Sequence, residues 1–180
     1  TMLPASVTVM EVSPRDGLQN EDVLVPTAQK LRLIDHALAS GSKRIEVTSF
    51  VHPLRVPQMA DAEAVCAGLP QRSDVRYTGL ILNERGYRRL RETHLDEAGL
   101  VVPLSDTFGE RNQGQRVADA VAMAREVIRD GQQTGFPVQV TLAVAFGCPF
   151  EGEVPLTNLL AAAEALLEAG PVEIALADTI

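Results

Sequence analysis

Cysteine is scarce in this sequence, and so is positive charge. The 180 residues include only two cysteines, Cys66 and Cys148, which are too few and too far apart for a disulfide framework or a tetrahedral zinc site. Acidic residues outnumber basic ones by 24 to 16, which gives a formal net charge of -8. The chain therefore lacks the broad cationic face that nucleic acid or an anionic membrane needs, and any anionic ligand must be held by local groups.

Long apolar runs are also missing. No stretch of about 18 uninterrupted apolar residues predicts a transmembrane helix, and the first residues lack the charged region, apolar core and cleavage site of a signal peptide. We expect a soluble cytoplasmic protein whose two thiols are free, as in a reducing compartment. The mitochondrial matrix stays open, because a transit peptide removed beforehand would leave the same sequence.

Six short runs recur along the chain, and most of them are apolar and β-branched. They cover residues 7–12, 44–50, 77–82, 98–104, 138–146 and 172–180. Such near-continuous runs are typical of parallel strands that are buried on both faces. Segments with helical spacing lie between them, at residues 26–40, 61–69, 84–94, 115–134 and 156–169. The strict alternation of strand and helix predicts an α/β protein built from βαβ units.

Two α/β folds share this alternation, an open doubly wound sheet and a closed (β/α)8 TIM barrel. A nucleotide-binding open sheet would show a glycine-rich turn after its first strand, but this turn has a single glycine, Gly17. Polar residues instead collect at the carboxyl ends of the strands, the face on which barrel enzymes build their sites. They are Arg15, Asp16, Glu46, Thr48, Ser105, Asp106, Asp178 and Thr179.

A full barrel has eight βα units and about 250 residues. We therefore expect residues 1–180 to form a single incomplete TIM-barrel catalytic domain, which holds the first six βα units of a truncated chain. The sequence shows no linker, low-complexity stretch or charge block that would indicate a second domain.

Arg15 and Asp16 place a guanidinium beside a carboxylate where the first strand enters a loop. At a barrel mouth, Asp16 could bind a hard divalent cation, and Arg15 could donate hydrogen bonds to an oxyanion that forms during reaction. The alternative is a solvated turn capped by Asp16. Glu46 needs a cationic partner if it faces inward, because desolvating a carboxylate costs several kcal/mol. Arg15 is the candidate partner, and the alternative places Glu46 outward against a helix.

Two loops carry further candidates. Residues 49–61 form a long, proline-rich loop that could shape a substrate entrance, where Arg55 and Gln58 could contact a ligand. His52 is expected to be a loop histidine and not a metal ligand. Cys148, in the turn after the fifth run, is expected to be a structural thiol and not a nucleophile, because no partnered His or Asn is identifiable.

Taken together, these segments resemble the 3-hydroxy-3-methylglutaryl-CoA lyase family of metal-dependent retro-Claisen lyases. The matching segments span almost the whole chain in order, and the run that begins with Arg15 and Asp16 is the most specific. They are Pro14-Arg15-Asp16-Gly17-Leu18-Gln19-Asn20-Glu21, Glu46-Val47-Thr48-Ser49-Phe50-Val51, Val56-Pro57-Gln58-Met59-Ala60-Asp61, Phe146-Gly147-Cys148-Pro149-Phe150-Glu151-Gly152 and Asp178-Thr179-Ile180.

The resemblance implies cleavage of 3-hydroxy-3-methylglutaryl-CoA to acetoacetate and acetyl-CoA with a divalent metal, Mg or Mn. It implies that Asp16 binds the metal and that Arg15, Glu46 and Asp178 are catalytic residues, with Arg15 stabilising an enolate and Glu46 orienting Arg15. Arg15, Gln19, Thr48 and Thr179 are expected to bind the substrate. The family's His-x-His metal ligands and its loop cysteine do not occur in these residues.

Several alternatives stay open. A lyase acting on another 3-hydroxyacyl-CoA is one, because Ala175 and Ala177 stand where related sequences often carry Ser and Gly. A Claisen-type synthase or 2-oxo-acid aldolase of the same barrel group would share the Arg-Asp pair and a metal. A molecule that ends at Ile180 would be an inactive fragment. For each of the enzyme alternatives we expect a small-molecule substrate, and an acyl-CoA is favoured. We expect no nucleic acid or membrane partner. The chain could also form a homo-oligomer.

Overall fold

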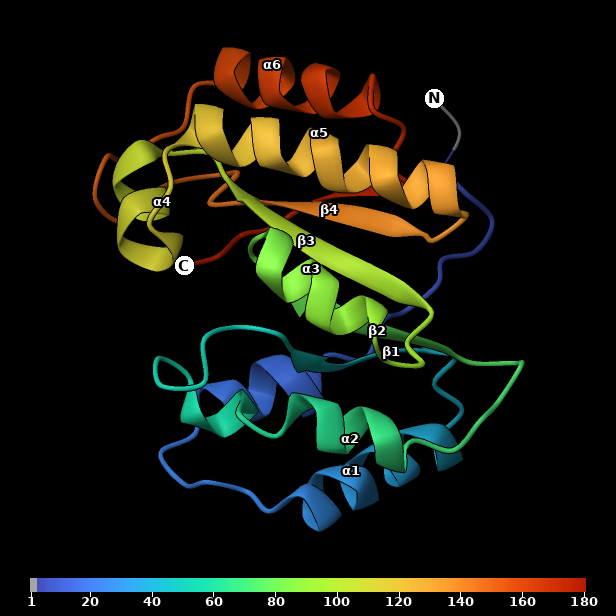
Figure 1. Ribbon diagram of the computed structural model, residues 1–180. Helices are drawn as coiled ribbons and strands as arrows, with labels where there is room; N and C mark the ends of the chain where they lie inside the picture. Colours follow the sequence, from blue (N-terminus) through green and yellow to red (C-terminus); the bar gives the residue numbers. More distant parts are fainter. Residues whose placement is uncertain (1–2) are drawn as a thin grey trace.

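The strands form one parallel sheet, with helices packed on its outer side (Figure 1). The structure is a computed structural model that describes residues 3–180. Its strands are β1 (Arg44–Ser49), β2 (Arg76–Ile81), β3 (Glu97–Pro103), β4 (Val138–Ala143) and β5 (Glu173–Leu176). Its α-helices are α1 (Thr27–Ala39), α2 (Ala62–Gly68), α3 (Glu84–Arg91), α4 (Asp106–Gln113), α5 (Val117–Thr134) and α6 (Leu156–Leu167).

The strand order distinguishes between the two candidate folds. A doubly wound sheet reverses its order at a switch point, whereas here each strand pairs in parallel with the next one along the chain. The sheet is also strongly curved. β1 and β5 are the two outermost strands and would lie about 19 Å apart in a flat sheet, yet Arg44 donates a 2.8 Å hydrogen bond to Glu173. The sheet therefore curls towards closure, as a barrel requires.

Helix α1 shows how local chemistry sets the bounds of an element. Ile34 and Ala37 face the core, and Gly41 follows the helix with a φ of 97°, a backbone conformation that favours glycine. Helices α2, α3, α5 and α6 also lie in the expected intervals.

Helix α4 was not expected. It begins directly after β3 because the Ser105 side chain caps it, accepting a 3.2 Å hydrogen bond from the N–H of Phe108.

Residues 7–12 depart from the expected six strands. Within this segment only Glu11 pairs with β1, through 2.9 Å hydrogen bonds to the backbone of Arg44 and Glu46. Val7 and Val9 are 79% and 74% exposed. Within residues 3–180 the segment has a sheet partner on one side only, so no second ladder holds it in a regular strand. The expected first strand is thus reduced to a single bridge.

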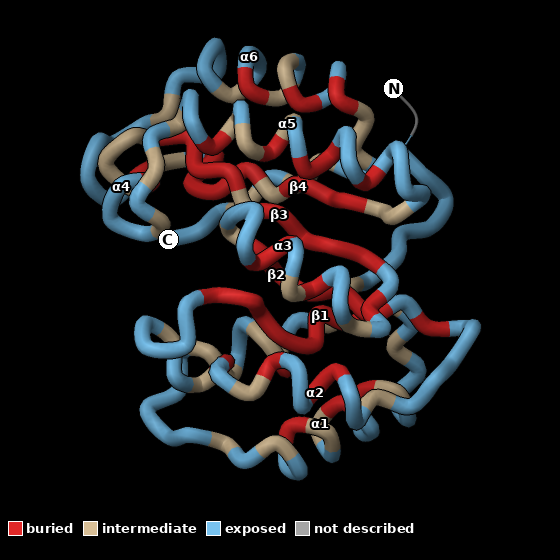
Figure 2. The backbone as a smooth tube through the Cα atoms, viewed as in Figure 1, coloured by how far each residue is buried: buried red, intermediate tan, exposed pale blue. Residues whose placement is uncertain are grey.

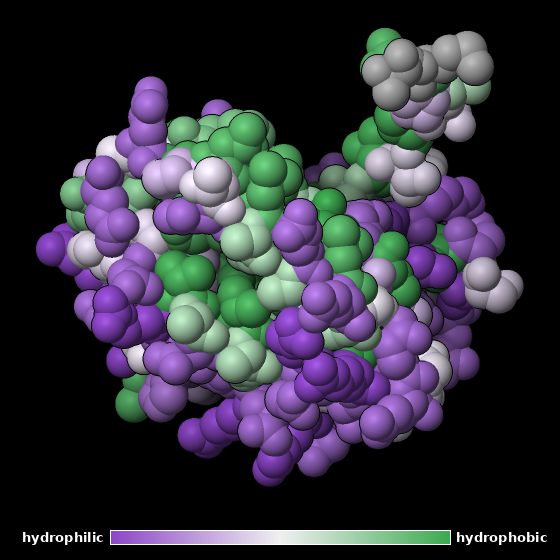
Figure 3. Space-filling view, turned by 90° about the horizontal axis from the view of Figure 1, so that it is seen from above, coloured by the Kyte–Doolittle hydropathy of each residue, from purple (hydrophilic) through white to green (hydrophobic). Residues whose placement is uncertain are grey.

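Buried residues concentrate in the strands and on the helix faces that cover them (Figure 2). Helix α6 is apolar on both sides: Ala162 and Leu166 are buried, whereas Leu156, Leu160 and Leu167 are exposed. Figure 3 looks down on this part of the molecule and shows apolar side chains gathered on its surface. Among the helices of residues 3–180, none has both the length and the apolarity that a membrane crossing requires.

A polar layer crosses the inner side of the sheet around Glu97, whose side chain is 0% exposed. The Glu97 carboxylate accepts hydrogen bonds from Arg44 (2.6 Å), Thr78 (3.2 Å) and Arg76 (3.3 Å). Two cations and a hydroxyl therefore compensate the buried charge. Since Arg44 also bonds to Glu173, the layer joins side chains of β1, β2, β3 and β5.

Candidate active site

The loop that carries Arg15 and Asp16 is a single π-helical turn, Ser13–Gly17. The N–H groups of Arg15 and Asp16 donate to the carbonyl of Val12 at 3.1 and 2.7 Å. The carboxylate of Glu11 accepts a 2.8 Å hydrogen bond from the first N–H of the turn. Because Glu11 also pairs with β1, the turn is held at the edge of the sheet beside this strand. Such π-turns are rare and are frequent at functional sites.

Arg15 lies between two carboxylates. Its Nε donates to Glu46 Oε1 at 2.5 Å, and its Nη1 donates to Asp16 Oδ1 at 2.8 Å. The exposed fractions of the side chains are 15% for Arg15, 6% for Glu46 and 55% for Asp16. Within residues 3–180, Nη2 of Arg15 makes no hydrogen bond, so its two N–H groups are free to bind a ligand. Glu46 therefore faces Arg15 and not an outer helix.

Glu46 is a buried carboxyl group whose protonation depends on Arg15. Burial raises its pKa, the charge and hydrogen bond of Arg15 oppose this rise, and the net direction is upward. A carboxyl group whose pKa is higher in the folded state stabilises the fold when it is protonated. This stabilisation is complete below the unfolded-state pKa of about 4.3 and is lost as the pH rises through the folded-state pKa. Arg15 is thus the group that keeps Glu46 able to ionise.

Gln19 and Thr48 lie near the end of β1 but differ in access. The hydroxyl of Ser49 donates to Gln19 Oε1 at 3.3 Å, so Gln19 is attached to the strand end. Thr48 is fully buried, and its Oγ1 lies 3.7 Å from Met59 Sδ. The Thr48 hydroxyl is therefore closed to solvent in this structure.

Thr179 ties the segment after β5 to the end of β4. Its hydroxyl accepts a 2.8 Å hydrogen bond from the N–H of Val144. Val144 has a φ of 53°, which is strained for a β-branched residue. Asp178 and Thr179 are exposed at the carboxyl end of the sheet, the same end as Arg15. Among the described residues, no hydrogen bond or ion pair joins Asp178 to Arg15.

The turn around Cys148 is attached to the start of α4. Its Sγ lies 2.9 Å from the Ser105 hydroxyl and accepts from the N–H of Phe150 at 3.4 Å. Cys148 and Gly152 exchange backbone hydrogen bonds of 2.8 and 2.9 Å. This geometry agrees with a structural thiol. Sequence reasoning missed the Ser105 partner because the two residues are 43 positions apart.

We expect the two thiols to differ in reactivity. Burial raises the pKa of Cys66 to about 12. Burial also acts to raise the pKa of Cys148, but the Ser105 hydroxyl and the backbone N–H of Phe150 outweigh it and lower this pKa. Because the thiolate is the reacting form, and a thiolate of lower pKa is also a weaker nucleophile, alkylation by iodoacetamide at pH 8 should be about 10- to 100-fold faster at Cys148. Peptide mass spectrometry measures both rates, and equal rates under native conditions would contradict the assignment.

Asp16 is the predicted metal ligand of this chain. Its carboxylate is largely exposed, and only Oδ1 contacts Arg15. Within the part of the chain that the structure describes, no three His, Cys, Asp or Glu side chains lie close enough together to hold a metal ion. Mg and Mn prefer several hard oxygen ligands. Asp16 therefore fits as one ligand of a set that residues 3–180 do not complete.

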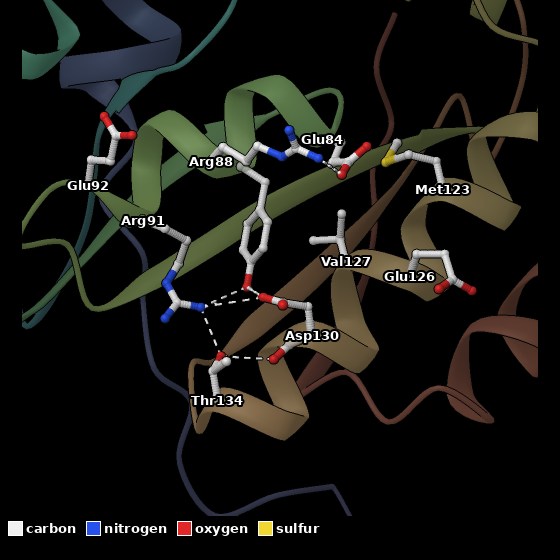
Figure 4. A pocket seen from close by; sticks show the side chains of 10 residues that line it. Glu84, Arg88, Arg91, Glu92, Met123, Glu126, Val127, Asp130 and Thr134 are labelled. Atoms are coloured by element: carbon white, nitrogen blue, oxygen red, sulfur yellow. Dashed lines mark hydrogen bonds and ion pairs between the residues drawn. The ribbon is translucent and has the colours of Figure 1, made fainter.

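A cavity of about 690 Å³ opens elsewhere, between α3 and α5 (Figure 4). Its polar side chains bond to one another: Tyr87 donates to Asp130 at 2.7 Å, and Arg91 donates to Tyr87 at 3.0 Å and to Thr134 at 2.9 Å. All of its lining residues belong to the outer helices or to their ends, and none is a predicted site residue. The cluster around Arg15 therefore remains the candidate active site.

Comparison with known proteins identifies the family of this chain and agrees with the fold. The family described as HMGL-like matches residues 6–180. The chain belongs to this family. The predicted family is thus confirmed, and the assignment covers the π-turn, all five strands and the segment with Thr179.

Relatives of this HMGL-like chain are acyl-CoA lyases. It is 36% identical over 177 residues to the hydroxymethylglutaryl-CoA lyase YngG of Bacillus subtilis, covering 98% of this chain and 59% of the relative. It is 35% identical to the (R)-citramalyl-CoA lyase of Chloroflexus aurantiacus, covering 97% and 58%. A solved HMG-CoA lyase of Acinetobacter baumannii, in complex with coenzyme A and 3-methylmalate, matches with a TM-score of 0.90 at 38% identity, covering 95% and 56%. The chain thus spans less than two thirds of each of these proteins.

Proposed function

We propose that this chain supplies part of the TIM barrel of a divalent-metal-dependent lyase that cleaves 3-hydroxy-3-methylglutaryl-CoA to acetoacetate and acetyl-CoA. The observation that carries the proposal is the Arg15 guanidinium, held by the buried Glu46 at 2.5 Å, with Asp16 beside it at the mouth of the barrel. In this proposal, residues 1–180 are one incomplete catalytic domain.

The reaction breaks the bond between the hydroxyl-bearing carbon and the carbon next to the thioester. The electron pair passes into the thioester as an enolate, and the hydroxyl gives its proton to a base as it becomes a ketone. The enolate then takes up a proton at carbon and becomes acetyl-CoA, so the reaction neither gains nor loses protons overall. Arg15 has free N–H donors at Nη2, which can hydrogen-bond to the enolate oxygen. Glu46 keeps the guanidinium in place before this charge develops, so no reorganisation is needed during the reaction. Asp178 is the proposed acid/base group, and Gln19, Thr48 and Thr179 the proposed substrate contacts.

A bound Mg or Mn ion lowers the pKa of a coordinated hydroxyl and so assists its deprotonation. Asp16 would hold the ion through its exposed carboxylate, while Arg15 limits the negative charge around it. Additional ligands would have to come from outside residues 3–180, since these residues hold no cluster of metal-binding side chains.

The comparisons leave two acyl groups for the substrate. The relative that acts on citramalyl-CoA is as similar to this chain as the hydroxymethylglutaryl-CoA lyase is, at 35% and 36% identity. Both names describe an acyl-CoA, which supports a coenzyme A thioester as the partner. A cytoplasmic location, with the mitochondrial matrix as the alternative, and homo-oligomerisation are further parts of the proposal.

The test is an assay of a completed barrel, defined as residues 1–180 joined to the segment that follows the matched region in the Bacillus subtilis relative. With 3-hydroxy-3-methylglutaryl-CoA and Mg or Mn, the completed barrel should release acetoacetate, and EDTA should abolish the release. Residues 1–180 alone should release none, because Asp16 alone cannot hold the cation tightly. Citramalyl-CoA, assayed in parallel, tests the acyl group.

Circular dichroism and coenzyme A binding show whether the completed barrel has folded. A folded barrel that binds coenzyme A but cleaves neither thioester would contradict the proposed activity. Product release that is unaffected by EDTA would contradict the metal.

A further inference from the structure

Lys30 is buried, although neither the predicted site nor the proposed reaction uses it. It lies on α1 and is 4% exposed, whereas Lys43, the other lysine of the sequence, is exposed. A lysine is seldom buried unless its ammonium group is paired, because removing the charge from water is costly. The partners of Lys30 therefore indicate what its burial achieves.

The ammonium group of Lys30 clamps the loop between β1 and α2. Its Nζ lies 2.5 Å from Asp61 Oδ1, and it also donates to the carbonyl of Gln58. Thr27, at the start of α1, donates from its hydroxyl to Asp61 Oδ2 at 2.6 Å. The first turn of α1 thereby fixes residues 58–61 through both side-chain and backbone contacts.

The clamped residues in turn hold the loop that carries Arg15. Gln58 Nε2 donates to the carbonyl of Glu21 at 2.7 Å. Met59 packs in a small apolar cluster with Leu80, and Leu18 packs against this cluster. Leu18 and Glu21 are themselves joined by a 3.3 Å backbone hydrogen bond. Residues 18–21, which directly follow the π-turn, are therefore anchored by Gln58 and Met59.

We propose that Lys30 is a positioning residue for the Arg15 site: through Gln58 and Met59 it fixes residues 18–21, and hence the turn that presents Arg15 and Asp16. The coupling runs from α1 through the loop after β1 to the loop after residues 7–12. The loop after β1 and the loop after residues 7–12 therefore form one structural unit. The importance of this coupling for catalysis rests on the proposed function, but the coupling itself can be measured without catalysis.

Hydrogen exchange of residues 1–180, followed by mass spectrometry, tests the coupling. Lys30→Met should raise exchange rates about 10- to 100-fold in peptides covering residues 13–21 and 57–61, and leave β3 and β4 unchanged. Gln58→Ala removes only the bond to Glu21 and should raise the rates at residues 13–21 alone. Lys43→Met is the matched control, because it removes the exposed pair with Asp74 and should change neither region.

Two results would overturn the proposal. In the first, Lys30→Met speeds exchange at residues 57–61 while residues 13–21 keep the wild-type rate, so that Lys30 anchors its own loop and nothing more. In the second, Lys30→Met speeds exchange throughout the chain, as global destabilisation would, and Gln58→Ala leaves residues 13–21 unchanged. A third combination of results would support the coupling. In it, Lys30→Met destabilises the whole chain, but Gln58→Ala speeds exchange at residues 13–21 only. These exchange rates do not depend on lyase activity. The proposed function can therefore fail while the coupling holds, and the coupling can fail while the proposed function holds.

Discussion

An Arg15→Gln variant of the completed barrel is expected to lose about 10²- to 10³-fold in kcat, with its folding nearly unchanged. The loss falls on kcat because Arg15 acts on charge that develops only in the transition state. Folding should tolerate the change because burial already raises the pKa of Glu46, so this group can take up a proton when its cationic partner is gone. Steady-state kinetics and thermal unfolding followed by circular dichroism measure the two effects.

Arg129→Gln is the matched control for this variant, because Arg129 is an exposed arginine of α5 and is not among the predicted site residues. Its kcat should stay within about twofold of wild type, as for most surface substitutions. If Arg15→Gln reduced stability and turnover together, Arg15 would be a structural residue. A normal kcat in Arg15→Gln would remove it from the reaction.

Glu97→Leu is expected to destabilise residues 1–180 by about 3–5 kcal/mol, because it leaves the Arg44 guanidinium in the interior without its fully buried partner. Arg76 and Thr78 lose their hydrogen-bond acceptor in the same substitution. The free energy of unfolding, obtained from urea titration, measures the effect.

Glu173→Leu is the control, since Glu173 pairs with the same arginine but is 44% exposed. Its removal should cost at most about 1 kcal/mol, as for an ion pair in contact with solvent. If the two variants cost the same, or if Glu97→Leu stabilised the chain, the polar layer would not contribute to stability as described.

The sequence predicts the central elements well because their periodicity is local. The apolar runs that become β1 to β4 each face a helix and the neighbouring strands, so burial demands the same residues that the pattern shows. Helices such as α1 carry their own start and stop signals, here Pro26 and Gly41. Such signals depend on a few neighbouring residues and can be recognised without knowing the fold.

Other features depend on distant residues and could not be predicted. Residues 7–12 have a strand-like sequence, but a regular strand there requires a second neighbour as well as β1. Helix α4 differs from these cases, because its start is fixed locally by the Ser105 cap, but its eight residues are too few for a helical periodicity to show in the sequence. The contact between Arg44 and Glu173 joins residues 129 positions apart, and it exists only because the sheet curls.

The candidate site divides in the same way. The pairing of Arg15 with Glu46 follows from the cost of burying a carboxylate, so the sequence was sufficient to predict it. The contact between Thr48 and Met59 depends on the path of the loop after β1, which the sequence does not specify. The buried Lys30 gave no signal, because an isolated lysine on an amphipathic helix is usually exposed.

A double-mutant cycle on kcat of the completed barrel tests most directly whether Glu46 acts by holding Arg15. If it does, Arg15→Gln combined with Glu46→Gln will be no slower than Arg15→Gln alone, within about twofold, because Glu46 has no effect once the guanidinium is absent. If the two losses multiply instead, Glu46 acts independently of Arg15, and the arrangement on which the proposed function rests is wrong.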